Sequence, residues 1–281
     1  MEEAKSENIH QMTMIEYFWR NTYQLVGWEE EHSENIFPDV FGCGFVLKIN
    51  DKFVFVTADH VIHKADEEAG ARTNKEYRYA IVCNQNDIKN GSFQTIFRPI
   101  GGFISLDKFD LGPYLRGEEE LEVALIPDMQ DYAFADFKPE YFQEILTHEL
   151  RINNDVLTRE GLFHIFICED AYTEPNENSK YMVVGTIPEP DKFDGIKWVR
   201  ANAAHWELNF IGTEEGMYKF ATSSQVKIEE WAGLSGAPFF DYDGNIVGML
   251  LRAVEGYDFV WVMPIHTILK MINEMIRIGQ L

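Results

Sequence analysis

The sequence predicts an all-β protein with two β-rich halves, a helical connector between them and a helix at the C-terminal end. Short runs of β-branched and aromatic residues recur along both halves, bounded by Gly, Pro, Asn and Asp. Residues 131–160 interrupt this pattern in mid-chain, and an amphipathic helical repeat follows Pro264. Two β-rich halves around a connector indicate a duplicated barrel.

Length and charge limit what this protein can bind. The 281 residues, 46% of them hydrophobic, are enough for two packed subdomains. The 24 Lys and Arg against 47 Asp and Glu give a formal net charge of -23. Such a surface repels phosphate backbones and anionic membranes, so we expect binding to neither nucleic acid nor membrane. It would attract basic peptides, although an acidic surface that only keeps the protein soluble is the alternative.

The cysteines and the N-terminal residues indicate a cytoplasmic protein. Cys43, Cys83 and Cys168 lie far apart, without the Cys-x-x-Cys spacing of a metal or redox site. An odd, sparse set argues against a disulfide framework and suits a reducing compartment. The first residues lack the basic start and apolar run of a signal peptide, and no apolar stretch approaches the roughly 18 residues of a membrane span.

The first half is expected to hold an N-terminal extension and one barrel. Residues 1–36 form the extension, in which 12–28 fits either a helix or a strand. Residues 37–130 form the barrel. It begins with a hairpin over 41–57 that turns at Asn50-Asp51, and its further strands are expected at 77–83, 92–99 and 123–126.

The second half follows the connector at 131–160, where Pro139 is a typical helix start and residues 141–150 have helical spacing. A second barrel is expected over residues 161–263. Its clearest element is a hairpin of strands 237–240 and 246–251 around Asp243-Gly244. Residues 264–281 form the closing helix, with an apolar face at Ile265, Ile268, Leu269, Ile272 and Ile276.

Ser235 lies at the mouth of this last hairpin. Gly233 and Gly236 flank it and leave the backbone free of Cβ atoms, so a substrate carbonyl could approach main-chain N–H groups. This is the setting of an acyl-transfer nucleophile. A simple tight connection would have the same glycines, so a serine of this kind needs a base and an acid elsewhere in the chain.

His60 and Glu122 are the candidate base and acid. His60 follows directly after a buried strand, a rigid position that suits a general base, although a histidine that only caps the strand is the alternative. Glu122 opens the apolar strand 123–126, where a carboxylate can point at a neighbour. His60 and His63 lack the further ligands of a zinc site, so we expect no metal and no cofactor.

Three stretches together resemble the chymotrypsin/trypsin-like serine peptidases, and the bacterial, disulfide-free branch is the closer match. These stretches are Gly42-Cys-Gly-Phe-Val with Thr57-Ala-Asp-His60, then Glu122-Val-Ala-Leu-Ile, then Gly233-Leu-Ser-Gly-Ala-Pro238. They stand in that family's order of His, acid and Ser, over a span from about residue 40 to the C-terminal helix.

The resemblance implies two packed six-stranded antiparallel barrels and a serine endopeptidase. Ser235 would be the nucleophile, His60 its base and Glu122 the acid that orients His60. The N–H groups of Gly233 and Ser235 would form the oxyanion hole, worth roughly 3 to 4 kcal/mol per donor. The substrate would be a protein or peptide, and insertions such as 64–76 leave room for a regulatory protein partner.

Two departures from the family matter. The family has aspartate where Glu122 stands, and the extra methylene displaces the carboxylate enough to cost about 100-fold in rate unless the strand shifts; Asp107 and Asp110 are the fallback acids. Glu229, six residues before Ser235, would place an acid at the floor of the specificity pocket and favour Lys or Arg before the scissile bond. The alternative is a surface acid, or one neutralised by Arg252.

A catalytically weak or inactive member of the same fold, which binds a peptide or protein in the cleft between the barrels, is the rival hypothesis. An α/β-hydrolase is disfavoured because Ser235 follows His60 in the chain and a strand follows Ser235.

Overall fold

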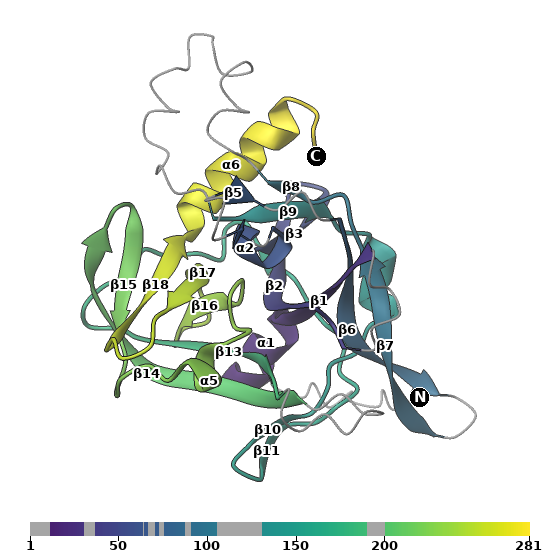
Figure 1. Cartoon of the computed structure of the whole chain (residues 1–281), viewed down its shortest axis with the longest axis horizontal. Coiled ribbons are helices and arrows are strands. Elements are labelled where there is room, and N and C mark those ends of the chain that lie inside the picture. The colour runs from purple at the N-terminus through teal and green to yellow at the C-terminus, as the bar shows by residue number, and fades with distance from the viewer. Residues whose placement is uncertain are drawn as a thin grey trace, which may run out of the picture.

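The computed structural model describes residues 12–30, 37–63, 65–66, 71–72, 76–87, 91–105, 131–189 and 200–281. Two β-rich halves lie side by side, the first in purple to teal and the second in green to yellow (Figure 1). The helix α1 (Met14–Asn21) lies between them and α6 (Ile265–Arg277) crosses one end.

The first half forms one eight-stranded sheet. Its strands run in the order β7-β6-β1-β2-β3-β9-β8, with β12 alongside β2. Neighbours along that path are antiparallel, and β12 pairs with β2 in parallel. The strands are β1 (Tyr23–Glu29), β2 (Val40–Ile49), β3 (Lys52–Thr57), β6 (Tyr77–Asp87), β7 (Ser92–Ile100), β8 (Ile104–Ser105), β9 (Ala133–Asp136) and β12 (Ile167–Cys168).

The second half is a closed barrel of six strands, all paired antiparallel in the order β13-β14-β15-β18-β17-β16. They are β13 (Lys180–Pro188), β14 (Arg200–Glu214), β15 (Met217–Ala221), β16 (Pro238–Asp241), β17 (Ile246–Ala253) and β18 (Phe259–Pro264). The expected all-β fold and C-terminal helix are confirmed, and this half is a six-stranded barrel as predicted. No pairing between the end strands β7 and β8 closes the first sheet within the described residues.

The short elements complete the chain. Two two-stranded pairs stand apart from the large sheets, β4 (Ala65–Asp66) with β5 (Ala71–Arg72) and β10 (Leu150–Ile152) with β11 (Asp155–Thr158). The other helices are α2 (Asp59–Ile62), α5 (Ile228–Trp231) and the 3-10 helix η2 (Pro139–Gln143). Among the described residues, no helix has the length and apolar character that crossing a membrane requires.

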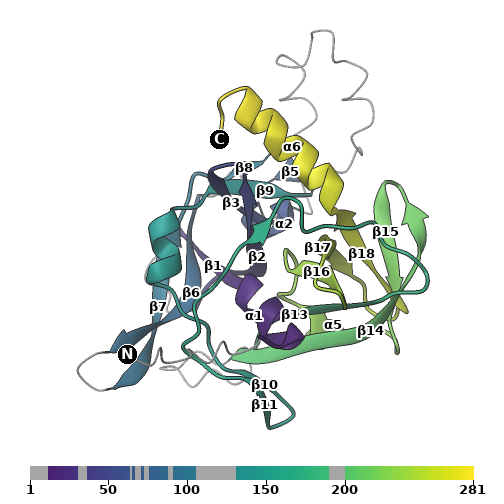
Figure 2. The same cartoon turned by 180° about the vertical axis from the view of Figure 1, so that it is seen from behind.

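A shared core joins the two halves. Phe18 of α1 stacks on Phe240 of β16 with ring centroids 4.6 Å apart, and both side chains are fully buried. The apolar face predicted for the last helix is buried at Ile265, Ile268, Leu269 and Ile272, as expected, and Ile276 packs against it. The view from behind shows α1 between β2 and β13 (Figure 2), so the halves are packed through this helix.

The helix expected after Pro139 is shorter than its spacing suggested. Pro139 starts η2, but the helix ends at Gln143. The backbone of Leu146 then exchanges hydrogen bonds with Asn84 of β6, at 2.8 and 2.9 Å, and Thr147 N–H donates to Leu162 at 2.7 Å. Tertiary pairing with the first sheet therefore outweighs the local helical pattern over residues 144–150.

The sheet of the first half extends beyond residues 37–130. β1 lies in the part expected as an N-terminal extension, yet it is paired on both sides, with β2 and β6. β9 lies in the part expected as a connector and pairs with β3 and β8.

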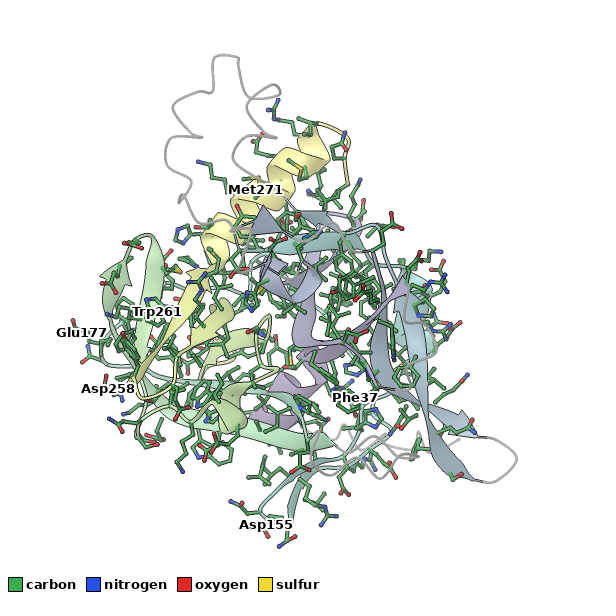
Figure 3. The ribbon with its side chains drawn as sticks, viewed as in Figure 1. Phe37, Asp155, Glu177, Asp258, Trp261 and Met271 are labelled. Carbon is green, nitrogen blue, oxygen red and sulfur yellow. The ribbon has the colours of Figure 1, made fainter. Side chains whose placement is uncertain are left out.

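Some acidic side chains outside the first sheet lie at the margin of the molecule. Asp155 at the β10–β11 hairpin, Glu177 and Asp258 are all exposed and lie at the outer edge, whereas Met271 of α6 is buried (Figure 3). Charges placed in this way are solvated, as the alternative interpretation of the acidic composition requires.

Candidate active site

The loop that carries Ser235 depends on two glycines. Gly233 and Gly236 have φ angles of +93° and +90°, a region that disfavours residues with a Cβ atom. A Cβ at position 236 would also lie 2.1 Å from the carbonyl oxygen of Cys43. Only glycine fits there, because the loop passes directly against β2 of the other half.

Cys43 ties this loop to the first sheet. Its backbone N–H donates to the carbonyl of Ser235 at 2.8 Å, and its thiol lies 3.2 Å from the carbonyl of Gly233. The hydroxyl of Thr57, at the end of β3, donates to the carbonyl of Cys43 at 2.6 Å. Burial raises the pKa of the Cys43 thiol to about 12, so the thiol stays protonated and acts as a donor.

His60 lies just beyond β3, on the second residue of α2. Its Nδ1 lies 2.9 and 2.8 Å from the two carboxylate oxygens of Asp131. Its backbone N–H donates to Oδ1 of the same carboxylate at 3.0 Å. The His60 side chain is 40% exposed while that of Asp131 is 8% exposed, so the acid lies behind the imidazole and the ring faces solvent.

Strand register brings His60 and Asp131 together. Thr57 at the end of β3 pairs with Ala133 at the start of β9 in an antiparallel register. His60 follows Thr57 by three residues and Asp131 precedes Ala133 by two, so both extend beyond the same end of the strand pair.

Asp131 is held in its charged form. Burial acts to raise the pKa of its carboxyl, but the hydrogen bonds and the charge of His60, with a smaller contribution from Arg252, outweigh burial and leave that pKa below its usual value. An ionised carboxylate at Nδ1 keeps the proton on that nitrogen and leaves Nε2 free to accept one.

His60 and Ser235 line the same cleft, of about 260 Å³. The Ser235 hydroxyl donates to the carbonyl of Leu251 at 3.2 Å, and no hydrogen bond joins it to His60 in the described structure. The rest of the lining is mostly apolar: Ile228, Trp231, Ala232, Leu250, Leu251, Arg252, Ala253 and Val254.

The two N–H groups expected to form an oxyanion hole have no acceptor. Within the described part of the chain, the N–H groups of Gly233 and Ser235 donate to no atom, whereas those of Leu234 and Gly236 donate to Trp231 and Leu250. The loop therefore leaves those two donors available to a bound oxygen.

The acids predicted from the sequence as partners of His60 do not lie among the described residues, unlike Ser235 and His60. Glu122, with the fallback residues Asp107 and Asp110, lies outside the described residues. The carboxylate beside His60 belongs to Asp131, which was not predicted from the sequence. A signal was present, because Asp131 directly precedes the small and aromatic residues 132–135 that continue into a buried strand.

Glu229 does not form the floor of the cleft. Residues 228–231 form the helix α5, and Glu229 is exposed on it. Residues three and four apart share a helix face, so Ile228, Trp231 and Ala232 line the cleft while Glu229 points elsewhere. No ion pair joins Glu229 to Arg252 in the described structure.

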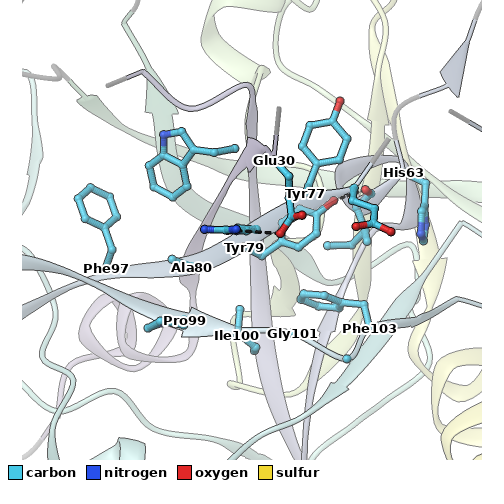
Figure 4. A pocket seen from close by; sticks show the side chains of 15 residues that line it. Glu30, His63, Tyr77, Tyr79, Ala80, Phe97, Pro99, Ile100, Gly101 and Phe103 are labelled. Atoms are coloured by element: carbon cyan, nitrogen blue, oxygen red, sulfur yellow. Dashed lines mark hydrogen bonds and ion pairs between the residues drawn. The ribbon is translucent and has the colours of Figure 1, made fainter. Parts of the chain in front are cut away.

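A larger hollow of about 1010 Å³ lies on the first sheet, away from Ser235. It is lined by aromatic side chains from β6, β7 and the residues after them, together with His63 and the ion pair of Glu30 and Arg78 (Figure 4). Tyr79 donates there to the carbonyl of Ile62. The described residues that line this hollow include a histidine but no serine.

No cluster of three or more His, Cys, Asp or Glu side chains that could hold a metal ion occurs in the described ranges. All three cysteines are free, with Cys43 and Cys83 buried and Cys168 exposed.

Comparison with known proteins yields structural likeness alone. No protein-family profile and no curated protein matches the chain. A serine endoprotease from Yersinia pestis has a similar structure, with 13% identity and a TM-score of 0.45, over 95% of this chain and 66% of the other. The chain thus spans just under two thirds of that protein. Deg5 is similar at 16% identity and a TM-score of 0.42, over 96% and 95% of the two chains.

Proposed function

We propose that the protein is a serine endopeptidase in which Ser235 is the nucleophile, His60 the general base and Asp131 the acid that orients the base. The observation that carries this proposal is the contact of both Asp131 oxygens with Nδ1 of His60, in a cleft that also contains the Ser235 hydroxyl. A capping histidine would need neither the buried acid nor the shared cleft.

The reaction begins with a rotation of the Ser235 side chain. Its hydroxyl leaves the carbonyl of Leu251 by rotation of the side chain and donates to Nε2 of His60. Nε2 takes the hydroxyl proton as Oγ attacks the carbonyl carbon of the scissile bond. Asp131 stabilises the imidazolium that forms, because its carboxylate remains ionised.

The oxyanion of the tetrahedral intermediate would accept hydrogen bonds from the N–H groups of Gly233 and Ser235. His60 then donates its proton to the leaving amine, which leaves an acyl group on Ser235. Water, deprotonated by the same imidazole, attacks that ester and restores the free enzyme. The hydrogen bonds from Cys43 of the first sheet to the carbonyls of Gly233 and Ser235 fix the loop, and with it the two N–H donors of the oxyanion hole.

Labelling with a fluorophosphonate probe tests this proposal. We expect the unmodified protein to be labelled at neutral pH, and Ser235→Ala and His60→Ala to lose the label. Ser223→Ala and His63→Ala are matched controls that should keep it, because Ser223 is an exposed loop residue and His63 lies outside the cleft. An unlabelled parent protein that still binds peptides would favour the rival hypothesis, a binding module.

The identity of the acid has its own test. We expect Asp131→Asn to remove most of the peptidase activity and Glu122→Gln to leave it within about threefold, as for residues outside the catalytic groups. The reverse result would restore Glu122 as the acid. The cytoplasmic location, a regulatory protein partner and the lack of nucleic-acid and membrane binding stay predictions.

A further inference from the structure

We infer that Arg252 selects substrates with an acidic side chain on the acyl side of the scissile bond, next to an apolar side chain in the cleft. This inference rests on the proposed peptidase function and names its substrate class. Arg252 lines the same cleft as Ser235 and His60, and it is the one permanently charged side chain among the lining residues.

Arg252 has no partner within the described chain. It is exposed, and no described residue forms an ion pair or hydrogen bond with it. Five of the seven arginines whose side chains the structure describes do have a glutamate partner. Arg20, Arg78, Arg98, Arg151 and Arg277 are each paired with a glutamate.

The backbone of β17 aims this side chain at the cleft. The register between β17 and β18 shifts at Leu251, so that Leu250 pairs with Val262 and Arg252 with Trp261. A bulge of this kind re-aims the next side chain. It leaves Leu251 buried, with its carbonyl facing the Ser235 hydroxyl, and Arg252 exposed beside it.

The charge of Arg252 acts on the catalytic groups only weakly. Its effect on the pKa of the Asp131 carboxyl is the smallest of the contributions, behind those of His60. Asp131 already accepts three hydrogen bonds from His60 and does not contact the guanidinium. The five donors of Arg252 thus face a cleft in which none of the described lining residues is an acid, and a substrate carboxylate is the group that would satisfy them.

The other residues that line the cleft determine which side chain is preferred directly before the scissile bond. Ile228, Trp231, Ala253 and Val254 are apolar, and the acid expected from the sequence at Glu229 is absent from the lining. A Lys or Arg side chain in this cleft would meet the positive charge of Arg252 without a counter-charge. The cleft therefore fits an apolar residue before the scissile bond and an acidic residue upstream of it.

Paired fluorogenic peptides test the inference. The pair shares Leu before the cleaved bond and differs only in Glu or Gln at one of the next three upstream positions. For the unmodified protein, kcat/KM should favour Glu by about tenfold at one position, as a charge-assisted hydrogen bond would give. Arg252→Gln should abolish that preference, and Arg252→Glu should reverse it, so that the Gln peptide is cleaved faster than the Glu peptide. Arg151→Gln, on the remote β10–β11 hairpin, is the matched control and should keep it.

Two results would overturn the inference. The first is an unmodified protein that labels with the fluorophosphonate but shows no preference for Glu at any of the positions. The second is an Arg252→Gln variant that slows both peptides equally and shifts the pH profile, since Arg252 would then act only through His60 and Asp131. A protein that does not label at all would instead overturn the proposed function.

Discussion

Two histidines three residues apart, His60 and His63, each contact an aspartate, but the two pairs lie in different regions of the molecule. His60 contacts Asp131 and lines the cleft with Ser235, while His63 contacts Asp59 and lines the larger hollow of the first sheet. In both pairs Nδ1 lies 2.8 Å from a carboxylate oxygen, and in both the aspartate is buried.

The contrast shows that the pair alone is not a catalytic signature. His63 follows Asp59 by four residues and caps the C-terminal end of α2, so a local turn is enough to join them. His60 and Asp131 are 71 residues apart, so the sheet must bring them together. What separates the two is the neighbour on the open side of the ring: a cleft with Ser235 in one case and aromatic side chains in the other.

The largest difference is expected from removal of each imidazole. We predict that His60→Ala lowers kcat for peptide hydrolysis by about 10⁶-fold, because the base and the serine act as a unit. His63→Ala should change kcat by less than about threefold, as it lies outside the proposed machinery. Hydrolysis rates of both variants on one fluorogenic peptide measure these changes. The Ser235→Ala variant, prepared in the same way, gives the background rate from contaminating peptidases. Equal losses in the two variants would show that this comparison has no functional meaning.

A smaller difference is expected from removal of each carboxylate. Asp131→Asn should lower kcat by about 10⁴-fold, because an amide no longer holds the proton on Nδ1 of His60. Asp59→Asn keeps the size of its side chain and should affect thermal unfolding more than kcat. Steady-state kinetics and melting curves of both variants separate the two effects; a loss of kcat with Asp59→Asn as large as that with Asp131→Asn would contradict the assignment.

A third histidine, His164, extends the comparison because no described acid contacts it. His164 is buried, stacks on Tyr23 at 4.3 Å and contacts the carbonyl of Arg20 through Nδ1 at 3.1 Å. Burial lowers its pKa to about 4, below the unfolded value of 6.5. The unfolded chain therefore binds more protons between these values, and stability must fall as pH decreases through that window.

We predict that His164 contributes a loss of up to about 3 kcal/mol in unfolding free energy between pH 7 and pH 4. His164→Asn should remove this part of the pH dependence while it retains a neutral donor for the carbonyl of Arg20. Urea unfolding at both pH values measures the difference between variant and parent. An unchanged slope with pH would mean that His164 titrates alike in the folded and unfolded chains.

The smallest effect is expected in the larger hollow. Phe97 is 46% exposed there and meets Trp28 edge-on, with ring centroids 5.3 Å apart. Phe97→Ala should change kcat/KM by less than about twofold, because an exposed ring distant from the cleft supports neither binding nor chemistry. A larger change in the same peptide assay would make the hollow part of the substrate site.

Local patterns in the sequence were enough to predict the elements that carry Ser235 and His60. The glycines around Ser235, the hairpin at Asp243-Gly244 and the apolar face of the last helix are short-range features, and the structure has them where they were expected. The strand that delivers His60 is of the same kind, since its run of β-branched and aromatic residues and its end lie within a few positions of each other.

Tertiary structure alone decided the partners of these residues. Asp131 reaches His60 through the pairing of β3 with β9, the bulge at Leu251 turns Arg252 into the cleft, and α5 turns Glu229 away from it. The connector helix ended early for the same reason, as Leu146 pairs with Asn84. Sequence patterns report periodicity within one segment, whereas these contacts depend on the register between segments far apart in the chain, which no single segment encodes.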